Sequence, residues 1–374
     1  MRFSIFIATV DLLLTVTTIF YYRYIFKSFR GGLYTFLYLL FSFNIVLNSM
    51  LSDAYPLGFL RMEAYLSGLW LGILFYSFII AVLHILLYGI CWGLGLNLRH
   101  KAVALVMMFV FGGIYIYGCR NAFQPVIRHE GIVTPKLEQG TRLRIAMVSD
   151  VHLGRLLGRN FSRDVVGLIK SQNPDMVIIA GDLADGKLNQ IIRGNALEPF
   201  DWLDAPQGVY MVFGNHDYFD NPVKWQRMLK LHKIKVLQSR SVPVLNGMVK
   251  LSGLIDFSRD SGTEGLRQLA TGNEHVYSIL VDHQPKRLAA AEEEKYDLYL
   301  SGHTHTGQMF PNRLVTHFMY DIDYGRRQYG NMTVIVSSGI GFWGPPVRSF
   351  TAPEVVVIDI EGSGSKKDQL ENKF

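Results

Sequence analysis

Two hydrophobic patterns divide the chain at about residue 118. Before it, four apolar stretches alternate with short polar connections, and they cover residues 3–22, 32–51, 66–94 and 102–117. A helix that crosses a bilayer needs about 20 predominantly apolar residues. A cleaved signal peptide would account for the first stretch but not for all of them. The pattern predicts a four-helix transmembrane region within residues 1–118, and the short last stretch also allows a re-entrant segment.

Two ionisable residues interrupt these apolar stretches. Asp11 lies in the first stretch and His84 lies in the third. At membrane depth such groups normally face the interior of a helix bundle or a polar cavity. We expect the two side chains to pair as a buried structural contact, and the alternative is a role in substrate handling.

After residue 143 the pattern changes to short β-rich runs separated by polar or amphipathic segments. The runs cover residues 145–148, 176–180, 209–213, 249–251, 276–281, 298–300, 334–337 and 355–360. Residues 161–171 and 222–231 have the spacing of amphipathic helices. The alternation predicts an α/β domain over residues 143–361, built as a two-sheet β-sandwich flanked by helices.

Two further segments complete the predicted organisation. Residues 119–142 are mixed in composition and contain Pro125 and Pro135, which favours a juxtamembrane connector. Residues 362–374 are rich in Gly, Ser and Lys, and we expect a disordered tail.

Composition limits the partners. At 49% hydrophobic residues the 374-residue chain is too apolar for an ordinary soluble enzyme. Its net charge of +6 suits an anionic partner, either nucleic acid or an anionic lipid surface. We favour the lipid bilayer and expect no nucleic acid, because the apolar half already indicates a membrane. Cys91 and Cys119, the two cysteines, provide neither a disulfide framework nor a thiolate zinc cluster.

Five polar blocks directly follow predicted strands. They are Asp150-Val151-His152, Gly181-Asp182, Gly214-Asn215-His216-Asp217, His283 and Gly302-His303-Thr304-His305. Open α/β sheets bind ligands at the carboxyl ends of their strands. We therefore expect the five blocks to converge in space, whereas polar residues scattered in loops would not share this position.

The blocks carry oxygen and imidazole ligands, which suit Mn, Fe, Co, Ni or Zn better than Mg or Ca. There are too many of them for one tetrahedral ion, and a carboxylate such as Asp182 can bridge two. The sequence therefore predicts two divalent metal ions, about 3.5–4 Å apart as in enzymes of this kind, with Mn favoured.

The order of these blocks resembles the calcineurin-like metallophosphoesterase superfamily, over about residues 143–360. Residues 149–154, 181–186, 282–285 and 301–308 look like its membrane-associated YaeI/YkuE-type branch, although Thr306 stands where that branch usually has a second glycine. The resemblance implies one metal ion held by Asp150, His152 and His305, another held by Asn215, His283 and His303, and Asp182 bridging them. This assignment leaves His216 as the one histidine of the blocks that is not needed as a ligand, and the resemblance implies catalytic roles for His216 and Asp217. Next to Asp217, His216 is suited to protonate a leaving oxygen or to stabilise developing charge, and a structural histidine is the alternative.

Some other residues are weaker candidates. Asp185, Asp256 and Arg348 are candidates for supporting or substrate contacts, and Gly181, Gly214 and Gly302 precede expected ligands, where close backbone approach is useful. The glycine-rich residues 338–344 are no dinucleotide fingerprint, since no helix with the required third glycine follows.

The resemblance implies a phosphodiesterase or pyrophosphatase that acts by attack of a hydroxide bridging the two ions. The apolar half favours a lipid-linked phosphoester as substrate. The alternatives are a nuclease of the same superfamily and a membrane sensor or scaffold with a vestigial phosphatase domain. The oligomeric state is open.

Charge distribution favours one topology. Arg23, Lys27 and Arg30 follow the first apolar stretch, whereas Arg2 alone precedes it. By the positive-inside rule the first connection is then cytoplasmic. We expect a multi-pass protein of a bacterial cytoplasmic membrane with an extracytoplasmic catalytic domain, and a cytoplasmic domain is the alternative.

Overall fold

A computed structural model describes residues 2–26, 32–50 and 55–364, which form two compact units. The helical unit comprises Met1–Phe123 together with Trp343–Ser349, and the α/β unit comprises Gln124–Phe342 with Phe350–Phe374. The predicted disordered tail lies outside the described residues, except that residues 362–364 end a strand.

Four helices make up most of the helical unit: α1 (Arg2–Ile25), α2 (Gly32–Met50), α3 (Leu57–Gly93) and α4 (His100–Asn121). Among the described residues, α3 and α4 are long and apolar enough to cross a membrane. Both begin before the apolar stretches that predicted them. Leu74 of α3 packs in a small core with Leu14 and Ile19 of α1 and Tyr38 of α2.

The predicted pair of Asp11 and His84 is wrong. His84 Nδ1 lies 2.5 Å from the hydroxyl of Tyr21 instead. Asp11 is buried, and its Oδ1 has no hydrogen-bond partner among the described residues. His84 of the third helix therefore has a tyrosine of α1 as the partner of its Nδ1, while its Nε2 has no hydrogen-bond partner among the described residues. Hydropathy does not reveal this pairing.

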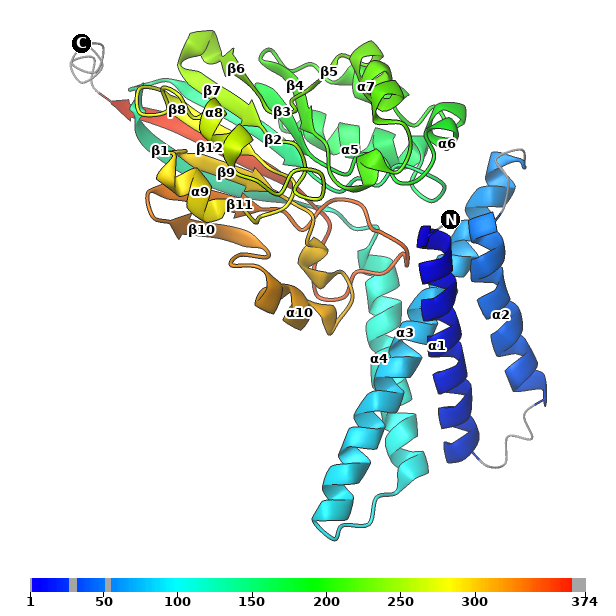
Figure 1. Cartoon of the computed structure of the whole chain (residues 1–374). Coiled ribbons are helices and arrows are strands. Elements are labelled where there is room, and N and C mark those ends of the chain that lie inside the picture. Colours follow the sequence, from blue (N-terminus) through cyan, green and yellow to red (C-terminus); the bar gives the residue numbers. More distant parts are fainter. Residues whose placement is uncertain (1, 27–31, 51–54, 365–374) are drawn as a thin grey trace. The chain divides into compact units, whose positions relative to one another are not determined.

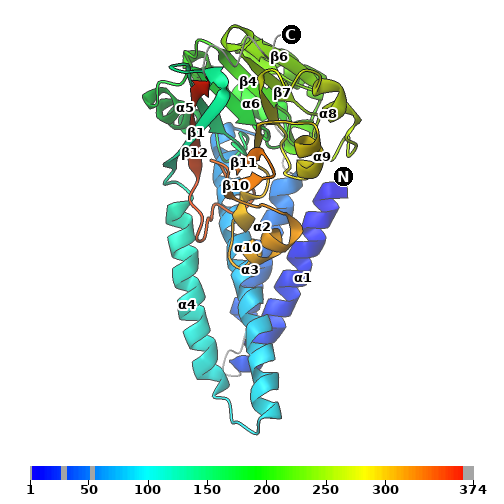
Figure 2. The same cartoon turned by 90° about the vertical axis from the view of Figure 1, so that its left-hand side faces the viewer.

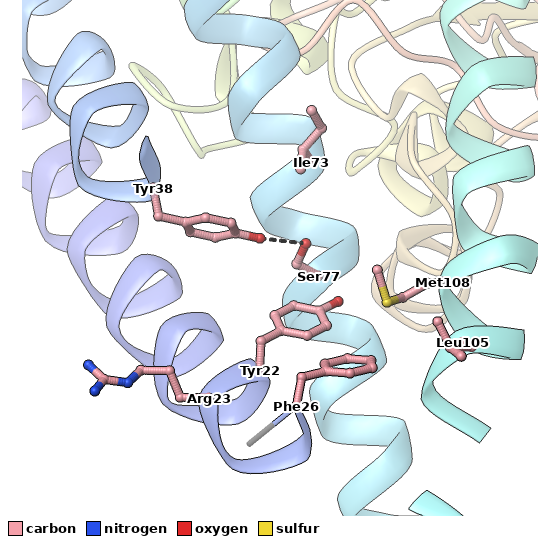
Figure 3. Close-up of a pocket in the computed structure, with 8 residues that line it drawn as sticks. All are labelled: Tyr22, Arg23, Phe26, Tyr38, Ile73, Ser77, Leu105 and Met108. Atoms are coloured by element: carbon pink, nitrogen blue, oxygen red, sulfur yellow. Dashed lines mark hydrogen bonds between the residues drawn. The ribbon is translucent and has the colours of Figure 1, made fainter. Parts of the chain in front are cut away.

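The helical unit contains a cavity of about 370 Å³ (Figure 3). Its lining is mostly apolar and aromatic and consists of Tyr22, Arg23, Phe26, Tyr38, Ile73, Ser77, Leu105 and Met108. The hydroxyls of Tyr38 and Ser77 lie 3.4 Å apart and give the cavity a polar point. Residues from all four helices line it, so the cavity belongs to the unit as a whole.

Two six-stranded sheets form the centre of the α/β unit (Figure 1). The first contains, in spatial order, β1 (Val126–Glu138), β12 (Glu354–Gly364), β2 (Arg142–Val148), β3 (Met176–Ala180), β4 (Gly208–Val212) and β5 (Ile234–Val236). The second contains β10 (Gly325–Tyr329), β11 (Met332–Val336), β9 (Leu298–Ser301), β8 (Tyr277–Val281), β7 (Val249–Gly253) and β6 (Arg240–Val244). Strands β2 to β5 are parallel, as are β7, β8, β9 and β11.

Alternation along each strand explains the layers. In β3, Met176 and Ile178 face the core between the two sheets, whereas Val177 and Ile179 face the helices that cover the first sheet. Those helices are α5 (Arg159–Ser171), α6 (Leu188–Arg193) and α7 (Pro222–Leu231); α8 (Glu264–Leu269) and α9 (Leu288–Glu293) cover the second sheet. The predicted two-sheet sandwich flanked by helices is confirmed (Figures 1 and 2).

The expected connector, residues 119–142, is largely a strand. β1 pairs in parallel with β12, from Val126 opposite Glu354 onward, and the register shifts between Thr134 and Glu138, around Pro135. Because β1 is an edge strand with few buried side chains, it has no clear hydrophobic alternation, and proline is tolerated at such an irregularity. Strands β5, β6 and β10 were not predicted either, and each is short and partly exposed.

Candidate metal centre

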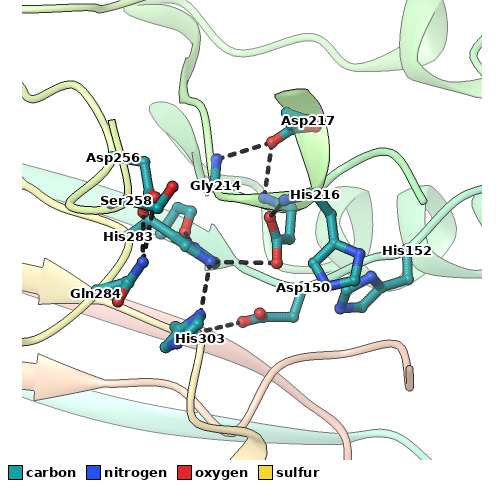
Figure 4. Close-up of polar contacts among 12 residues, drawn as sticks. Asp150, His152, Gly214, His216, Asp217, Asp256, Ser258, His283, Gln284 and His303 are labelled. Carbon is teal, nitrogen blue, oxygen red and sulfur yellow. Dashed lines mark hydrogen bonds and ion pairs between the residues drawn. The ribbon is translucent and has the colours of Figure 1, made fainter. Parts of the chain in front are cut away.

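The polar blocks lie at the carboxyl ends of five parallel strands. Strands β2, β3 and β4 of the first sheet lead to Asp150, Asp182 and Asn215, and strands β8 and β9 of the second lead to His283 and His303. Figure 4 shows several of these side chains directed toward one another from the two sheets. The site is therefore built where the two sheets present the same edge.

One cluster consists of Asp150, His152 and His305, whose ligand atoms lie within 4.8 Å of one another. The Nε2 atoms of the two histidines are 3.1 Å apart, and His305 Nε2 is 3.5 Å from Asp150 Oδ1. Two imidazole nitrogens and a carboxylate that face a common point are the donors of a transition-metal site.

A second cluster consists of Asp182, His283 and His303. His283 Nε2 lies 3.2 Å from Asp182 Oδ2 and 3.3 Å from His303 Nδ1. The other nitrogen of His283, Nδ1, donates to the carbonyl of Ala180 at 2.8 Å, which directs the Nε2 lone pair into the site.

The two clusters are continuous. A third group, His152, Asp182 and His216, shares one member with each of them. Asp182 thus lies between the sets, which is the place that a bridging carboxylate requires.

Unsatisfied buried atoms test whether the residues suit metal ions. Among the described residues, Asp150 Oδ1 and Asn215 Oδ1 are buried and have no hydrogen-bond partner. A buried polar atom without a partner costs about 1–3 kcal/mol, so such atoms normally have an explanation. Coordination of divalent ions by these donors explains them, and the residues therefore fit the ions that the sequence predicts.

The backbone of the site is held in unusual conformations. Asp150, His152, Asp182, His303 and His305 all have positive φ, between 47° and 71°. Non-glycine residues in this region are uncommon and concentrate at functional sites, where the surrounding structure imposes the strain.

Three glycines allow close approach at the site, and one of them is Gly302, where a Cβ would lie 2.5 Å from Asp150 Oδ2. A Cβ atom on Gly214 would lie 2.1 Å from Asp182 Oδ1, and one on Gly181 would lie 2.2 Å from His283 Nδ1. Each of these distances is shorter than real Cβ contacts, so no other residue fits without displacing these side chains.

Asp217 is a structural anchor in this geometry. Its carboxylate accepts hydrogen bonds from the backbone N–H groups of Asp182, Ala184 and Gly214 at 2.8–2.9 Å, and from Trp225 Nε1 at 3.1 Å. It thereby joins the loops after β3 and β4. Although Asp217 is adjacent to His216 in the sequence, the carboxylate that bonds to His216 Nδ1 is that of Asp185, at 2.9 Å.

Comparisons with known proteins agree with this site. The calcineurin-like phosphoesterase family model matches residues 143–307. A metallophosphoesterase of Campylobacter jejuni is 30% identical, over 97% of this chain and 100% of its own length. The chain belongs to the calcineurin-like metallophosphoesterase family. It is a metal-dependent phosphoesterase.

Other relatives extend this result. A metallophosphoesterase of Helicobacter pylori is 31% identical over 75% of this chain and 78% of its own length. A zebrafish (Danio rerio) transmembrane protein with a metallophosphoesterase domain is 30% identical over 70% of this chain and 63% of its own length. Among solved structures, an archaeal phosphodiesterase aligns over 53% of this chain with a TM-score of 0.31 and 15% identity.

The histidines of the site differ in their pKa, because each has different charges beside it. Burial, with the neighbouring charge of His216, lowers the pKa of His152, and burial, with His283, lowers the pKa of His303 to about 4. Both imidazoles are therefore neutral near pH 7, the form that binds a metal ion.

His216 is different. Burial alone would lower its pKa, but the carboxylates of Asp182 and Asp185 raise it to about 9. The two carboxylates thus favour the protonated form of the His216 imidazole, which is the state of a proton donor.

Several supporting residues were not found from the sequence. Arg287 donates to both oxygens of Asp282 at 2.8 Å, and the hydroxyl of Tyr299 donates to Asp282 Oδ2 at 2.7 Å. This buried network stabilises the loop that carries His283. Asp282 directly follows β8 beside His283, whereas Arg287 and Tyr299 lie outside the blocks, so no spacing indicates these two.

The weaker candidates have diverse positions. Asp256 is buried and accepts two hydrogen bonds from Gln284 Nε2, at 3.0 and 3.1 Å, so it supports the loop beside His283. Arg348 groups with the helical unit, where its backbone N–H donates to Gly118. The glycine-rich residues 338–344 pack on the first block: Gly341 N–H donates to the carbonyl of Asp150 at 2.9 Å.

Proposed function

We propose that this metallophosphoesterase hydrolyses a phosphodiester or pyrophosphate bond of a lipid-linked substrate at a membrane, with two divalent metal ions. The observation that carries the proposal is the continuous cluster of carboxylates and imidazoles in a chain that also has two helices apolar enough to span a bilayer. The donor set supports Mn, Fe, Zn, Co or Ni, of which we favour Mn.

In this proposal Asp150, His152 and His305 hold one ion, Asn215, His283 and His303 hold the other, and Asp182 bridges them. The clustering of ligand atoms within 4.8 Å and the unpartnered Oδ1 of Asn215 support the assignment. When bound, the ions neutralise the phosphate oxygens and activate a water for attack on phosphorus.

The chain's own residues complete the reaction. His216, protonated and oriented through Nδ1 by Asp185, donates its Nε2 proton to the leaving oxygen. Asp217 acts as a positioning residue, because its four hydrogen bonds hold the loops that carry Asp182 and His216.

We further propose that all four helices span a bacterial cytoplasmic membrane and that the chain belongs to the YaeI/YkuE-type branch. The membrane-related name of the Danio rerio relative supports membrane association. Arg23, in the last turn of α1, and Lys27 and Arg30, which follow in the sequence, favour an extracytoplasmic α/β unit. A cysteine at Asp164, whose side chain is 66% exposed, should then react with an impermeant reagent in intact spheroplasts. Protection until lysis would place the unit in the cytoplasm.

The function is tested with the full chain in lipid nanodiscs. We expect about two metal ions per chain by elemental analysis, and hydrolysis both of a chromogenic phosphodiester and of a lipid-linked phosphoester. Asp182→Asn should lose most metal and activity, whereas Asp164→Asn, at an exposed site on α5, should lose neither.

Two outcomes would contradict the proposal. Normal metal content and turnover in Asp182→Asn would refute the bridging assignment. The substrate class would be refuted if the protein hydrolysed the soluble diester but no lipid-linked phosphoester, and if a deletion strain kept an unchanged lipid profile. A phosphorylated lipid precursor that accumulates in that strain would identify it.

A further inference from the structure

Helix α10 (Asn312–Met319) presents an unusually apolar surface to solvent. Leu314, Val315, Phe318 and Met319 are 58, 55, 87 and 64% exposed, and no residue of this helix is buried. Their spacing along the helix places all four on one side. Single exposed apolar residues are normal, whereas a contiguous patch marks an interaction surface.

The helix lies outside the layers that cover the two sheets. Figure 1 shows α10 beyond the second sheet, and Figure 2 agrees from a second direction. The apolar face of α10 therefore does not serve the hydrophobic cores, none of which includes a residue of this helix.

Contacts on both sides of α10 connect it to the loop with His303 and His305. A Cβ on Gly307 would lie 2.3 Å from the backbone nitrogen of Arg313, so the helix begins in close contact with this loop. Beyond the helix, Asp323 accepts hydrogen bonds from Thr304 and from Thr316, at 2.6 and 2.8 Å. The position of α10 is therefore fixed relative to the metal centre.

Further apolar side chains and one arginine lie at or next to the exposed face of α10. Phe310, just before the helix, has its ring 5.6 Å from that of Phe350, which is 54% exposed. The helix contains Arg313, which is exposed, and no carboxylate. An apolar face bordered by an arginine suits a lipid surface, because apolar side chains enter the acyl region while the guanidinium stays among the phosphates.

We propose that α10 inserts its apolar face into the surface of the bilayer and thereby presents the metal centre to phosphates at the headgroup level. This inference rests on the proposed function, in which the substrate is a membrane lipid. A bilayer is favoured over a second protein because α3 and α4 are apolar enough to keep the chain at one. Anionic lipid also complements the exposed guanidinium of Arg313.

The test measures contact with lipid directly. The full chain, with Cys91→Ser and Cys119→Ser, receives Phe318→Cys and an environment-sensitive fluorophore, in nanodiscs of phosphatidylcholine and phosphatidylglycerol. The matched control is Leu231→Cys, because Leu231 on α7 is also apolar and 74% exposed. We expect lipids spin-labelled on the acyl chain to quench the fluorophore at position 318 and not at 231.

Equal quenching at the two positions, or none at either, would overturn the proposal. Disulfide formation between two copies of the unlabelled Phe318→Cys protein, with no quenching of the labelled protein, would assign the face to a second copy of the chain. Protection of position 318 only when a long-chain substrate analogue is added, again without quenching, would assign it to the substrate tail.

A second measurement separates docking from folding. In Leu314→Asp/Phe318→Asp we expect the rate on lipid substrate to fall at least about tenfold more than the rate on the soluble diester, because burial of two large apolar side chains is lost. Leu231→Asp should leave the ratio of the two rates unchanged. An unchanged ratio in the double variant would refute the docking role.

The two proposals can fail separately. Quenching does not depend on turnover, so quenching without lipid hydrolysis would refute the lipid substrate and leave docking in place. Lipid hydrolysis without quenching would refute the docking of α10 alone.

Discussion

The strongest single test of the site is Gly214→Ala, which adds one methyl group beside the proposed bridging carboxylate. The new Cβ would lie 2.1 Å from Asp182 Oδ1 and 2.6 Å from the Asp182 backbone nitrogen. Contacts below 3.0 Å do not occur for real Cβ atoms, so one of the two loops must move.

Neither loop can move at low cost. The Asp182 N–H donates to Asp217, and Asp182 Oδ1 accepts from the His216 N–H, both at 2.8 Å. Asp182 Oδ2 faces His283 at 3.2 Å. A shift that relieves the clash therefore breaks a hydrogen bond or displaces a proposed ligand.

The magnitudes follow from these constraints. Forcing an extra methyl group into a packed site costs about 1–3 kcal/mol, and each kcal/mol lowers Tm by about 2–4 °C in a domain of this size. Because a misplacement of about 1 Å in a reacting geometry can cost about 10²-fold, we expect kcat/KM on the chromogenic diester to fall by about that factor. Elemental analysis should find fewer metal ions per chain.

The control is Gly167→Ala in the middle of α5. Apart from the backbone of its own helix and its chain neighbours, no atom lies within 4 Å of the position of its Cβ, so the same chemical change meets open space. Alanine is favoured over glycine in a helix by about 0.5–1 kcal/mol, and we expect slightly higher stability with unaltered activity. Native metal content and activity in Gly214→Ala would refute the close packing of the two loops around Asp182.

Four further predictions concern the same site. His216→Ala should keep its metal ions but lose about 10²–10⁴ in rate, with a larger loss for alkyl esters than for nitrophenyl esters; equal losses would contradict proton donation to the leaving group. Asp217→Ala should lower the free energy of unfolding by about 2–5 kcal/mol in chemical denaturation, because it removes the acceptor of four N–H donors, and an unchanged unfolding midpoint would exclude the anchoring role. Burial alone would lower the pKa of His283, but Asp182 raises it well above its usual value, so metal binding must displace a proton from this imidazole. Calorimetry should therefore find that metal affinity increases with pH and that binding releases protons. A metal affinity that does not depend on pH would exclude His283 as a ligand. Thr306→Gly should raise Tm or leave it unchanged, since Thr306 has φ of 52° and a buried hydroxyl without a partner among the described residues. A clear decrease in Tm would show that the hydroxyl stabilises the fold.

Local patterns alone determined much of the architecture. The alternating apolar runs predicted the central strands β2, β3, β4, β7, β8, β9, β11 and β12, because strands buried on both faces are continuous apolar segments. The amphipathic spacing predicted α5 and α7. The five polar blocks were recognisable because parallel strands end at one edge of their sheet, so position after a strand is itself spatial information.

Partners distant in sequence required the tertiary structure. The sequence suggested Asp217 as the neighbour of His216, yet adjacent residues on a 3-10 turn point in different directions, and Asp185 from another loop makes the contact. Similarly, His84 pairs with Tyr21, and β1 became visible only through its pairing with β12. The sequence determines which segments are buried, because hydrophobic burial depends on the type of each residue and on its spacing. The tertiary structure alone decides the hydrogen-bond partners and the free face of α10, because these depend on which surfaces the folded chain brings together.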